Sequence, residues 1–457
     1  MKAKPLTLLV AFFIALQILL LIKTPILRWD EAVYVAMGKY LFSFGTSGLW
    51  EQLRPIITPM IYGFFWKIGA DPIFFGHIIA IVFSTFFLIV TAYLGTSLFD
   101  ERTGIIATLM IVITPSFFYH SNTLLTDIPA AALSLAALLY CLRSRPIFAG
   151  FLVGVATLIR FPAALAFISM IIISIDDTKR RKDILALSIA FFVVLIPFLL
   201  FNIGMYHTEY SIIASAFHPF ALSSQSQNNL AESQPFYYYI QILAFPTIWF
   251  LFSIVGFMHL PKKRMYIRYA LIYLTTHFIY YSIIINKQDR FVFTFLPIIA
   301  IFSAHGIIIM WKIRWVRVFL VLGICIGLIL TVNIGGHFVS WRLNPSDLNY
   351  TLFLNFAQEY PYSIFLTSNP IPAAYSDARF LTYYHNVEIG ERDFSAFINQ
   401  SDFVIFSKEA YYCPPANLTC LQHLSTLQTM ANSSGTQVLG LTHEGRTYSI
   451  YKHLHTR

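Results

Sequence analysis

Long runs of apolar residues alternate with short polar segments along most of the chain. A run of about 20 apolar residues lets a helix cross a bilayer, and a helix satisfies its own backbone hydrogen bonds there. The pattern therefore predicts an α-helical polytopic membrane protein with about eleven transmembrane helices. The predicted spans are 6–24, 73–98, 104–120, 126–142, 146–160, 162–175, 184–205, 236–259, 269–285, 291–310 and 316–334.

The pattern changes from about Asn344 onward. The stretches "YSIFLTSN" and "DFVIFSKE" are typical of short buried strands, and residues 347–358 and 392–400 are typical of helices. We therefore expect a transmembrane domain at 1–341 and a small extracytoplasmic α/β soluble domain at 342–457.

Composition supports a membrane protein. The chain is 57% hydrophobic and only 12% charged, whereas soluble proteins have about 25% charged residues. A single soluble core cannot hide that much apolar surface. The net charge of +9 does not indicate a nucleic-acid partner, because Lys and Arg collect in the cytoplasmic loops of multi-span proteins.

Charge also predicts the topology. With the N-terminus in the cytoplasm, the cytoplasmic segments carry about twice as many Lys and Arg residues as the opposite side. An odd number of spans then places the C-terminal domain outside the cytoplasm. We expect the plasma membrane of a prokaryote, or the endoplasmic reticulum if the protein is eukaryotic. The N-x-Ser/Thr sequons agree, since all fall in this domain, at Asn349, Asn399, Asn417 and Asn432. Cys413 and Cys420 could form a local disulfide there, whereas Cys141 and Cys325 lie in apolar runs.

Two adjacent acids follow the first apolar run, in "RWDEAVY". Ionised acids at a membrane face are costly unless they are solvated or paired, so Asp30 and Glu31 are functional candidates. The alternative is a pair of solvated acids at the start of a helix. Arg54 closes the same loop, residues 25–72, which we expect to contain short interfacial helices. Its guanidinium can clamp a phosphate, or it can simply bind lipid headgroups.

Further candidates lie in other outside segments. Asp127 opens the fourth span in "LLTDIPAAALSLAALLY", where a plain helix start is the alternative. Lys287 and Arg290 fill a short outside turn, against the usual charge bias. Arg160 lies between the fifth and sixth spans and can also be a snorkelling residue. His218 could ligate a metal or contact substrate, although a lone loop histidine more often does neither.

Four stretches together resemble the GT-C superfamily of membrane glycosyltransferases. They are "RWDEAVY", "LRPIITP", "LLTDIPAAALSLAALLY" and "NKQDRFVFTFLPIIA". The chain is most similar to the branch that contains protein O-mannosyltransferases and the aminoarabinose transferases of lipid A. The resemblance covers residues 1 to about 310 and depends on the order, side and spacing of the motifs.

The resemblance implies a polyprenyl-phosphate or dolichyl-phosphate sugar donor, a hexose such as mannose, and an extracytoplasmic protein, lipid or glycan acceptor. It places Asp30 and Glu31 at the catalytic centre. It assigns donor phosphate binding to Arg54, Lys287 and Arg290. Two departures matter: relatives often have Pro-Pro after the basic residue, where this chain has Pro55-Ile56, and the Trp-Trp-Asp motif of oligosaccharide-transferring relatives is absent.

The mechanism that we expect is inverting transfer. Asp30 accepts the proton of the acceptor hydroxyl while that oxygen attacks the anomeric carbon, and the cations stabilise the departing phosphate. Glu31, Asp127 and Arg160 orient the sugar or the acceptor. A divalent metal held by Asp30, Asp127 and His218 is left open.

Two other readings compete with a transferase. A transporter or lipid-linked sugar flippase would also have many spans, but it would carry charges at mid-membrane and paired halves, and no internal repeat is visible. A receptor would use its tail as the working part. The tail lacks a catalytic constellation, so we interpret it as an acceptor-recognition or structural module whose deletion alters acceptor choice more than donor turnover.

Overall fold

The structure is a computed structural model. It describes residues 3–22, 26–51, 54–176, 181–206, 234–244, 248–260, 264–284, 287–315, 317–318, 321–322, 325, 329, 348–383, 391–407, 418–443 and 446–453. By their contacts these residues form two units. The first unit has its described parts within Met1–Lys23, His77–Ser224 and Glu232–Trp341, and the second within Thr24–Gly76 and Arg342–Arg457. The first loop therefore belongs to the same unit as the C-terminal segment.

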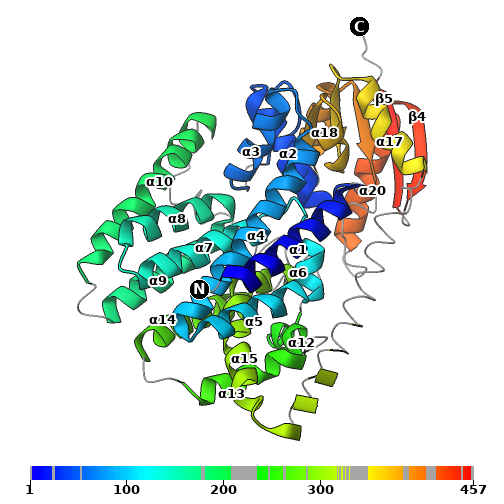
Figure 1. The fold of residues 1–457 in the computed structure, drawn as a ribbon. Coiled ribbons are helices and arrows are strands. Elements are labelled where there is room, and N and C mark those ends of the chain that lie inside the picture. The colour runs from blue at the N-terminus through cyan, green and yellow to red at the C-terminus, as the bar shows by residue number, and fades with distance from the viewer. Residues whose placement is uncertain are drawn as a thin grey trace. The chain divides into compact units, whose positions relative to one another are not determined.

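Helices make up the first unit (Figure 1). They are α1 (Ala3–Leu19), η1 (Leu20–Ile22), α4 (Pro72–Leu98, from His77 on), α5 (Glu101–Val112), α6 (Pro115–His120), α7 (Asp127–Leu142), α8 (Pro146–Ile159), η2 (Phe161–Ala163), α9 (Ala164–Asp176), α10 (Asp183–Tyr206), α12 (Tyr238–Ala244), η4 (Ile248–Phe252), α13 (Ser253–Met258), α14 (Arg264–Ile283), η5 (Asp289–Thr294) and α15 (Leu296–Met310).

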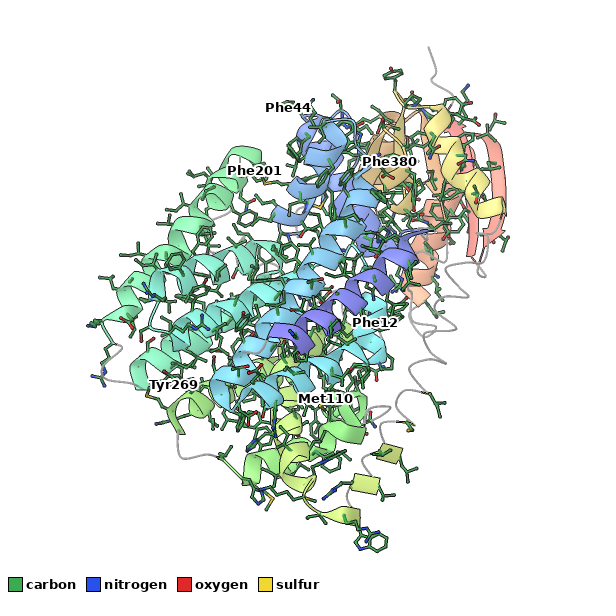
Figure 2. All side chains as sticks on the ribbon, viewed as in Figure 1. Phe12, Phe44, Met110, Phe201, Tyr269 and Phe380 are labelled. Carbon is green, nitrogen blue, oxygen red and sulfur yellow. The ribbon has the colours of Figure 1, made fainter. Side chains whose placement is uncertain are left out.

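The outer faces of these helices are apolar. Along α10, Leu185, Ile189, Phe192 and Leu200 are each more than half exposed. Phe12 on α1 is exposed as well, whereas Met110 and Tyr269 lie in the core (Figure 2). An exposed apolar surface of this extent is unfavourable in water and favourable in lipid. The fold therefore agrees with a multi-pass membrane protein.

The predicted spans are only partly recovered as single helices. Pro72–Leu98 and Asp183–Gly204 are long and apolar enough to cross a membrane. The third predicted span is wrong as one helix, because α5 ends at Val112 and α6 begins at Pro115. Proline cannot continue the helix, since it lacks the N–H donor. The predicted span 236–259 is likewise divided among α12, η4 and α13, most of 316–334 lies outside the described residues, and the count of eleven stays a prediction.

The second unit combines two loop helices with a small α/β domain. The loop helices are α2 (Trp29–Phe42) and α3 (Ile57–Lys67). The C-terminal elements are α17 (Leu348–Glu359), β1 (Ile364–Thr367), α18 (Ile371–Tyr375), β2 (Arg379–Thr382), α19 (Glu391–Asn399), β3 (Phe403–Phe406), α20 (Leu418–Ser433), β4 (Gly435–His443) and β5 (Arg446–His453).

The sheet has the order β2-β1-β3-β5-β4. β1 pairs in parallel with β2 and β3, and β5 pairs antiparallel with β3 and β4. The predicted strands are β1 and β3, and the predicted helices are α17 and α19. Their hydrophobic runs were readable because β1 and β3 are buried in the middle of the sheet.

Two glycines set the packing of α2 against α3. A Cβ atom on Gly38 would lie 2.5 Å from the Pro59 carbonyl oxygen and 2.6 Å from the Gly63 nitrogen. The two backbones can approach this closely only because neither position carries a side chain. The contact fixes α3 beside the helix that begins with the candidate acids.

Gly38→Ala tests this contact. We expect a loss of about 1–3 kcal/mol of stability, because the added methyl overpacks a backbone contact that cannot yield. The measurement is thermal unfolding of the purified protein in detergent. Gly204→Ala on α10 is the matched control, since no described atom lies within 4 Å of its added Cβ. Equal melting temperatures for the two variants would contradict the close helix crossing.

Candidate functional site

The candidate acids lie in the first turn of α2. Glu31 is buried, and its Oε2 accepts a hydrogen bond from the backbone N of Arg28 at 2.8 Å. This is the return half of a capping box, and it satisfies a backbone donor that a helix start leaves free. Carboxylates in the first turn also favour the helix dipole. Glu31 therefore has a structural contact, while Asp30 is turned to a different partner.

Arg54 lies between two carboxylates. Its Nη2 is 2.8 Å from Asp30 Oδ1, and its Nε is 2.9 Å from Glu51 Oε2. Its Nη1 also reaches the Tyr34 hydroxyl at 3.4 Å. Burial alone would lower the pKa of Arg54, but the charges of Asp30 and Glu51 raise it well above its ordinary value. We call Asp30, Glu51 and Arg54 the acidic cluster, since its net charge is about −1 with all groups ionised.

A second set of charges belongs to the first unit. Asp127, the first residue of α7, is almost completely buried. Its Oδ1 lies 3.1 Å from Arg160 Nη1, and its Oδ2 lies 3.6 Å from Arg290 Nε. Both guanidinium groups lie over the ring of Phe291, at 4.5 and 5.8 Å from its centroid. We call Asp127, Arg160 and Arg290 the basic cluster, since its net charge is about +1.

The plain helix-start reading of Asp127 does not account for this geometry. Thr126 is the N-cap of α7, and its side chain makes no capping hydrogen bond. The Asp127 oxygens instead face arginines from two other parts of the chain. A buried carboxylate needs such partners, because isolated burial of a charge is very costly. The structure thus brings together three of the predicted site residues.

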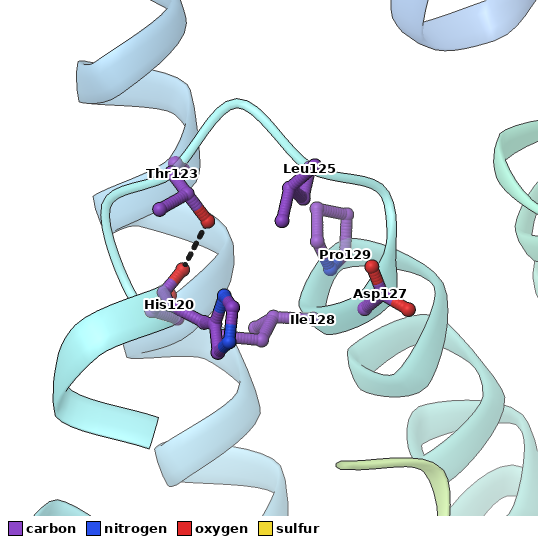
Figure 3. Close-up of a pocket in the computed structure, with 8 residues that line it drawn as sticks. His120, Thr123, Leu125, Asp127, Ile128 and Pro129 are labelled. Carbon is purple, nitrogen blue, oxygen red and sulfur yellow. Dashed lines mark hydrogen bonds between the residues drawn. The ribbon is translucent and has the colours of Figure 1, made fainter. Parts of the chain in front are cut away.

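Asp289 lies between Lys287 and Arg290 in the chain, and it forms its own contacts. Ser116 Oγ donates to Asp289 Oδ2 at 2.8 Å, and His120 Nε2 lies 3.3 Å from the same oxygen. Burial would raise the pKa of Asp289, but the hydrogen bonds from His120 and Ser116 lower it to about 2. His120 also lines a cavity of about 10 Å³ with Thr123 and Asp127 (Figure 3). This cavity has room for about one water molecule and for no larger ligand.

Lys287 makes a different set of contacts from Arg290. Its ammonium donates to the carbonyl oxygens of Gln234 and Ile284, at 3.0 and 2.6 Å. It also lines a pocket of about 530 Å³ whose other walls are mainly apolar side chains of α12 and α14. An apolar pocket with a lysine at its edge can hold a hydrocarbon chain that carries an anionic group.

The hypothesis of a metal site gains no support from the geometry of the described residues. The described residues contain no group of three or more His, Cys, Asp or Glu that could hold a metal ion. Arg54 faces Asp30, and arginines face Asp127, so both carboxylates are paired with guanidinium groups. His218 and Cys413 lie outside the described residues. The acidic and basic clusters belong to different units, and each is described by itself.

Two of the participants were missed by reasoning from the sequence. Glu51 precedes Arg54 by three residues, which is a spacing that permits an ion pair. The sequence did not identify His120 as a site residue, because its partner Asp289 is distant in the chain.

Asp127→Asn tests the basic cluster. The change leaves Arg160 and Arg290 without their buried counter-charge, so we expect a loss of about 3–5 kcal/mol of stability. Unfolding in mixed detergent micelles measures it. Asp183→Asn, at the partly exposed start of α10, should cost about 0.3–1 kcal/mol. A similar cost for both variants would mean that the cluster is not held by Asp127.

A pH dependence follows from Asp289. Because its folded pKa is lowered from 3.8 to about 2, its ionised form stabilises the fold above about pH 4, and this contribution is lost as the pH falls toward 2. Asp289→Asn should therefore lose less stability than the wild type between pH 5 and 2, measured by thermal unfolding. The exposed Asp393→Asn serves as control. Parallel curves for the wild type and Asp289→Asn would contradict the contacts with His120 and Ser116.

Part of the chain is similar in sequence to a known protein family. Residues 53–206 match the model of the dolichyl-phosphate-mannose-protein mannosyltransferase family. The match includes Arg54, Asp127 and Arg160, and it leaves out Asp30, Lys287 and Arg290. None of the curated proteins matches the chain by sequence.

Solved structures share the fold over nearly the whole chain. ArnT from Cupriavidus metallidurans, bound to undecaprenyl phosphate, has a TM-score of 0.64 and 12% identity over 98% of this chain and 99% of its own. The oligosaccharyltransferase of Archaeoglobus fulgidus, tethered to an acceptor peptide, has a TM-score of 0.62 and 13% identity over 99% and 74%. AglB of the same organism, with an inhibitory peptide and a dolichol-phosphate, has a TM-score of 0.57 and 12% identity over 98% and 74%.

Residues 53–206 are thus similar in sequence to a mannosyltransferase family, and the fold of the chain is similar to the folds of ArnT and of an oligosaccharyltransferase. The chain resembles the protein O-mannosyltransferase and ArnT branch of the GT-C superfamily, as its motifs predicted.

Proposed function

We propose that the chain transfers a single sugar, a hexose such as mannose, from a polyprenyl-phosphate donor to an extracytoplasmic acceptor. The observation that carries the proposal is the partly exposed Asp30 carboxylate beside Arg54 at the start of α2. The acidic cluster has the groups that a general base requires, and the basic cluster has those that a phosphate requires. The acceptor can be a protein, a lipid or a glycan.

Asp30 is suited to act as the base. Its carboxylate lies 2.8 Å from Arg54, which favours the ionised form. About a quarter of the Asp30 side chain is exposed, so a substrate can reach it, whereas the Glu51 side chain is only 2% exposed. Glu51 therefore acts on Arg54, and Arg54 orients Asp30. Glu31 holds the first turn of α2 in place through the Arg28 nitrogen.

The basic cluster is the better candidate for the donor phosphate. With Arg54 between two carboxylates, the acidic cluster repels an anion, so Arg54 contributes less to phosphate binding than the motif alone implies. Arg160 and Arg290 share one carboxylate and retain a net positive charge. Arginine presents a planar fork of donors that matches phosphate oxygens.

Lys287 and its pocket suit the lipid part of the donor. The pocket walls include Phe236, Phe278 and Ile279. A polyprenyl chain is a hydrocarbon, and its burial against such side chains gains about 25 cal/mol per Å². Two structural relatives are bound to undecaprenyl phosphate and to a dolichol-phosphate, which supports the same chemical class of donor here.

The reaction proceeds in one displacement. The acceptor hydroxyl oxygen forms a bond to the anomeric carbon, its proton passes to Asp30, and the bond between that carbon and the phosphate oxygen breaks. Polyprenyl phosphate leaves from the opposite face, so the anomeric configuration inverts. Arg160 and Arg290, with Lys287, stabilise the charge that develops on the phosphate. The absence of a Trp-Trp-Asp motif from the sequence favours a single sugar over an oligosaccharide.

Release of free polyprenyl phosphate from polyprenyl-phosphate hexoses tests the proposal. The purified wild type should release it, and Asp30→Asn should lower the rate by about 10²–10⁴-fold, because the base is lost. Asp393→Asn, an exposed change in α19, should keep the wild-type rate. Melting temperatures show that all three proteins are folded. No release with any donor would overturn the proposal and favour a transporter or flippase, and release unchanged in Asp30→Asn would overturn the role of Asp30.

A further inference from the structure

One residue of the C-terminal segment contacts three parts of the first loop. Asp377 Oδ1 lies 3.2 Å from the Lys39 ammonium of α2 and accepts a hydrogen bond from Trp66 Nε1 of α3 at 2.9 Å. Its backbone oxygen accepts a hydrogen bond from Ser47 Oγ, in the turn between the two helices. Asp377 therefore joins α2, α3 and the turn that connects them.

The neighbours of Asp377 extend the contact through the backbone. The Ser376 carbonyl oxygen accepts a second hydrogen bond from Lys39, at 2.9 Å. Gly48 N donates to Ala378 O, and Phe380 N donates to Gly48 O, both at 2.8 Å. The loop thus forms a bridge with the edge strand β2. Gly48 has φ +74°, a conformation that glycine adopts readily.

The apolar side of α2 belongs to the core of the C-terminal domain. Val33, Ala36 and Met37 are fully buried in one hydrophobic cluster with Phe365 and Phe380 of the sheet. These positions share a helix face, because residues three and four apart lie on one side.

The same helix carries Asp30 in its first turn. Asp30 and Tyr34, four residues apart, both meet Arg54. Asp30 lies three residues before Val33 and seven before Met37, so the candidate base is on the side of α2 that packs against the C-terminal domain. Lys39 lies nine residues after Asp30, which is about 13 Å along the helix.

We propose that the C-terminal domain holds α2 in the position that Asp30 needs, with Asp377 and Lys39 as the positioning residues. The proposal rests on the proposed function, because it gives Asp30 the role of the base. It assigns the domain a part in donor turnover, beyond the acceptor recognition that the sequence indicated. A displacement of about 1 Å at a reacting group can cost about 10²-fold in rate.

Because Lys39 is buried, it depends on its contact with Asp377. Its side chain is 5% exposed, and an ammonium group in such a place must keep its partners. Burial lowers the pKa of Lys39, while the Asp377 carboxylate opposes that shift. Removal of the carboxylate therefore leaves Lys39 with the Ser376 carbonyl oxygen, and α2 loses its ionic contact with the domain.

Asp377→Ala in the full-length protein is the test, with Asp377→Asn and Asp393→Ala beside it. Asparagine retains an oxygen that can accept from Lys39 and Trp66, so it should restore most of the function. We expect Asp377→Ala to lower kcat for donor turnover about 10- to 100-fold, with KM for the donor within about threefold of the wild type, because donor binding does not use Asp377. Asp393→Ala should match the wild type.

Hydrogen exchange supplies a readout that needs no donor. Peptides that cover residues 29–42 should exchange at least about fivefold faster in Asp377→Ala than in Asp393→Ala, because α2 opens more often. Unchanged exchange together with unchanged kcat overturns the positioning role. A higher KM for the donor with kcat preserved overturns the positioning role as well. A wild type that exchanges as expected but releases no polyprenyl phosphate refutes the proposed function, and the catalytic part of this inference with it.

Discussion

An ionised side chain that leaves water loses several kcal/mol of solvation, and only a counter-charge or a set of hydrogen bonds can replace it. Among the described residues, Glu31, Lys39, Glu51, Asp127 and Lys287 are buried charged side chains. Each of them has such partners: the Arg28 nitrogen, Asp377, Arg54, two arginines and two backbone carbonyls, respectively. The candidate site follows from this constraint, because the pairs that satisfy burial are also the pairs that orient the reactive groups.

The same constraint limits what the sequence could predict. Asp30, Arg54, Asp127, Arg160 and Arg290 were identifiable one at a time, since charges are scarce in an apolar chain and each interrupts a hydrophobic pattern. Their pairing was not, because the partners of Asp127 come from distant segments. The spacing of hydrophobic residues along a helix does not show which charged residues form ion pairs. The site residues were therefore predicted as a set, and the structure supplies their division into an acidic and a basic cluster.

Hydrophobic patterns predicted helices and strands well where a segment is uniformly buried, and poorly where a helix is interrupted. The strands β1 and β3 were found from their apolar runs, because both lie inside the sheet. The break before Pro115 was missed, since the apolar run continues across it and hydropathy does not register a missing N–H donor. The bridge from Gly48 to β2 was also beyond the sequence, because a single residue pair has no periodicity. Hydrophobic patterns therefore do not predict which short segments pair with one another in the folded chain.

The role of Arg54 shows how charge balance can decide between two readings of one motif. The resemblance to GT-C enzymes implies that the basic residue before Pro55 contacts donor phosphate. A phosphate beside Arg54 would also lie near Asp30 and Glu51, which are within 3 Å of the guanidinium, and like charges at short distance repel by several kcal/mol where water is excluded. At Asp127 the balance is reversed, because one carboxylate faces two guanidinium groups. An arginine between two carboxylates is better suited to orient a base, whereas two arginines that share one carboxylate are better suited to bind an anion, and each proposed role follows from the charge balance within its own cluster.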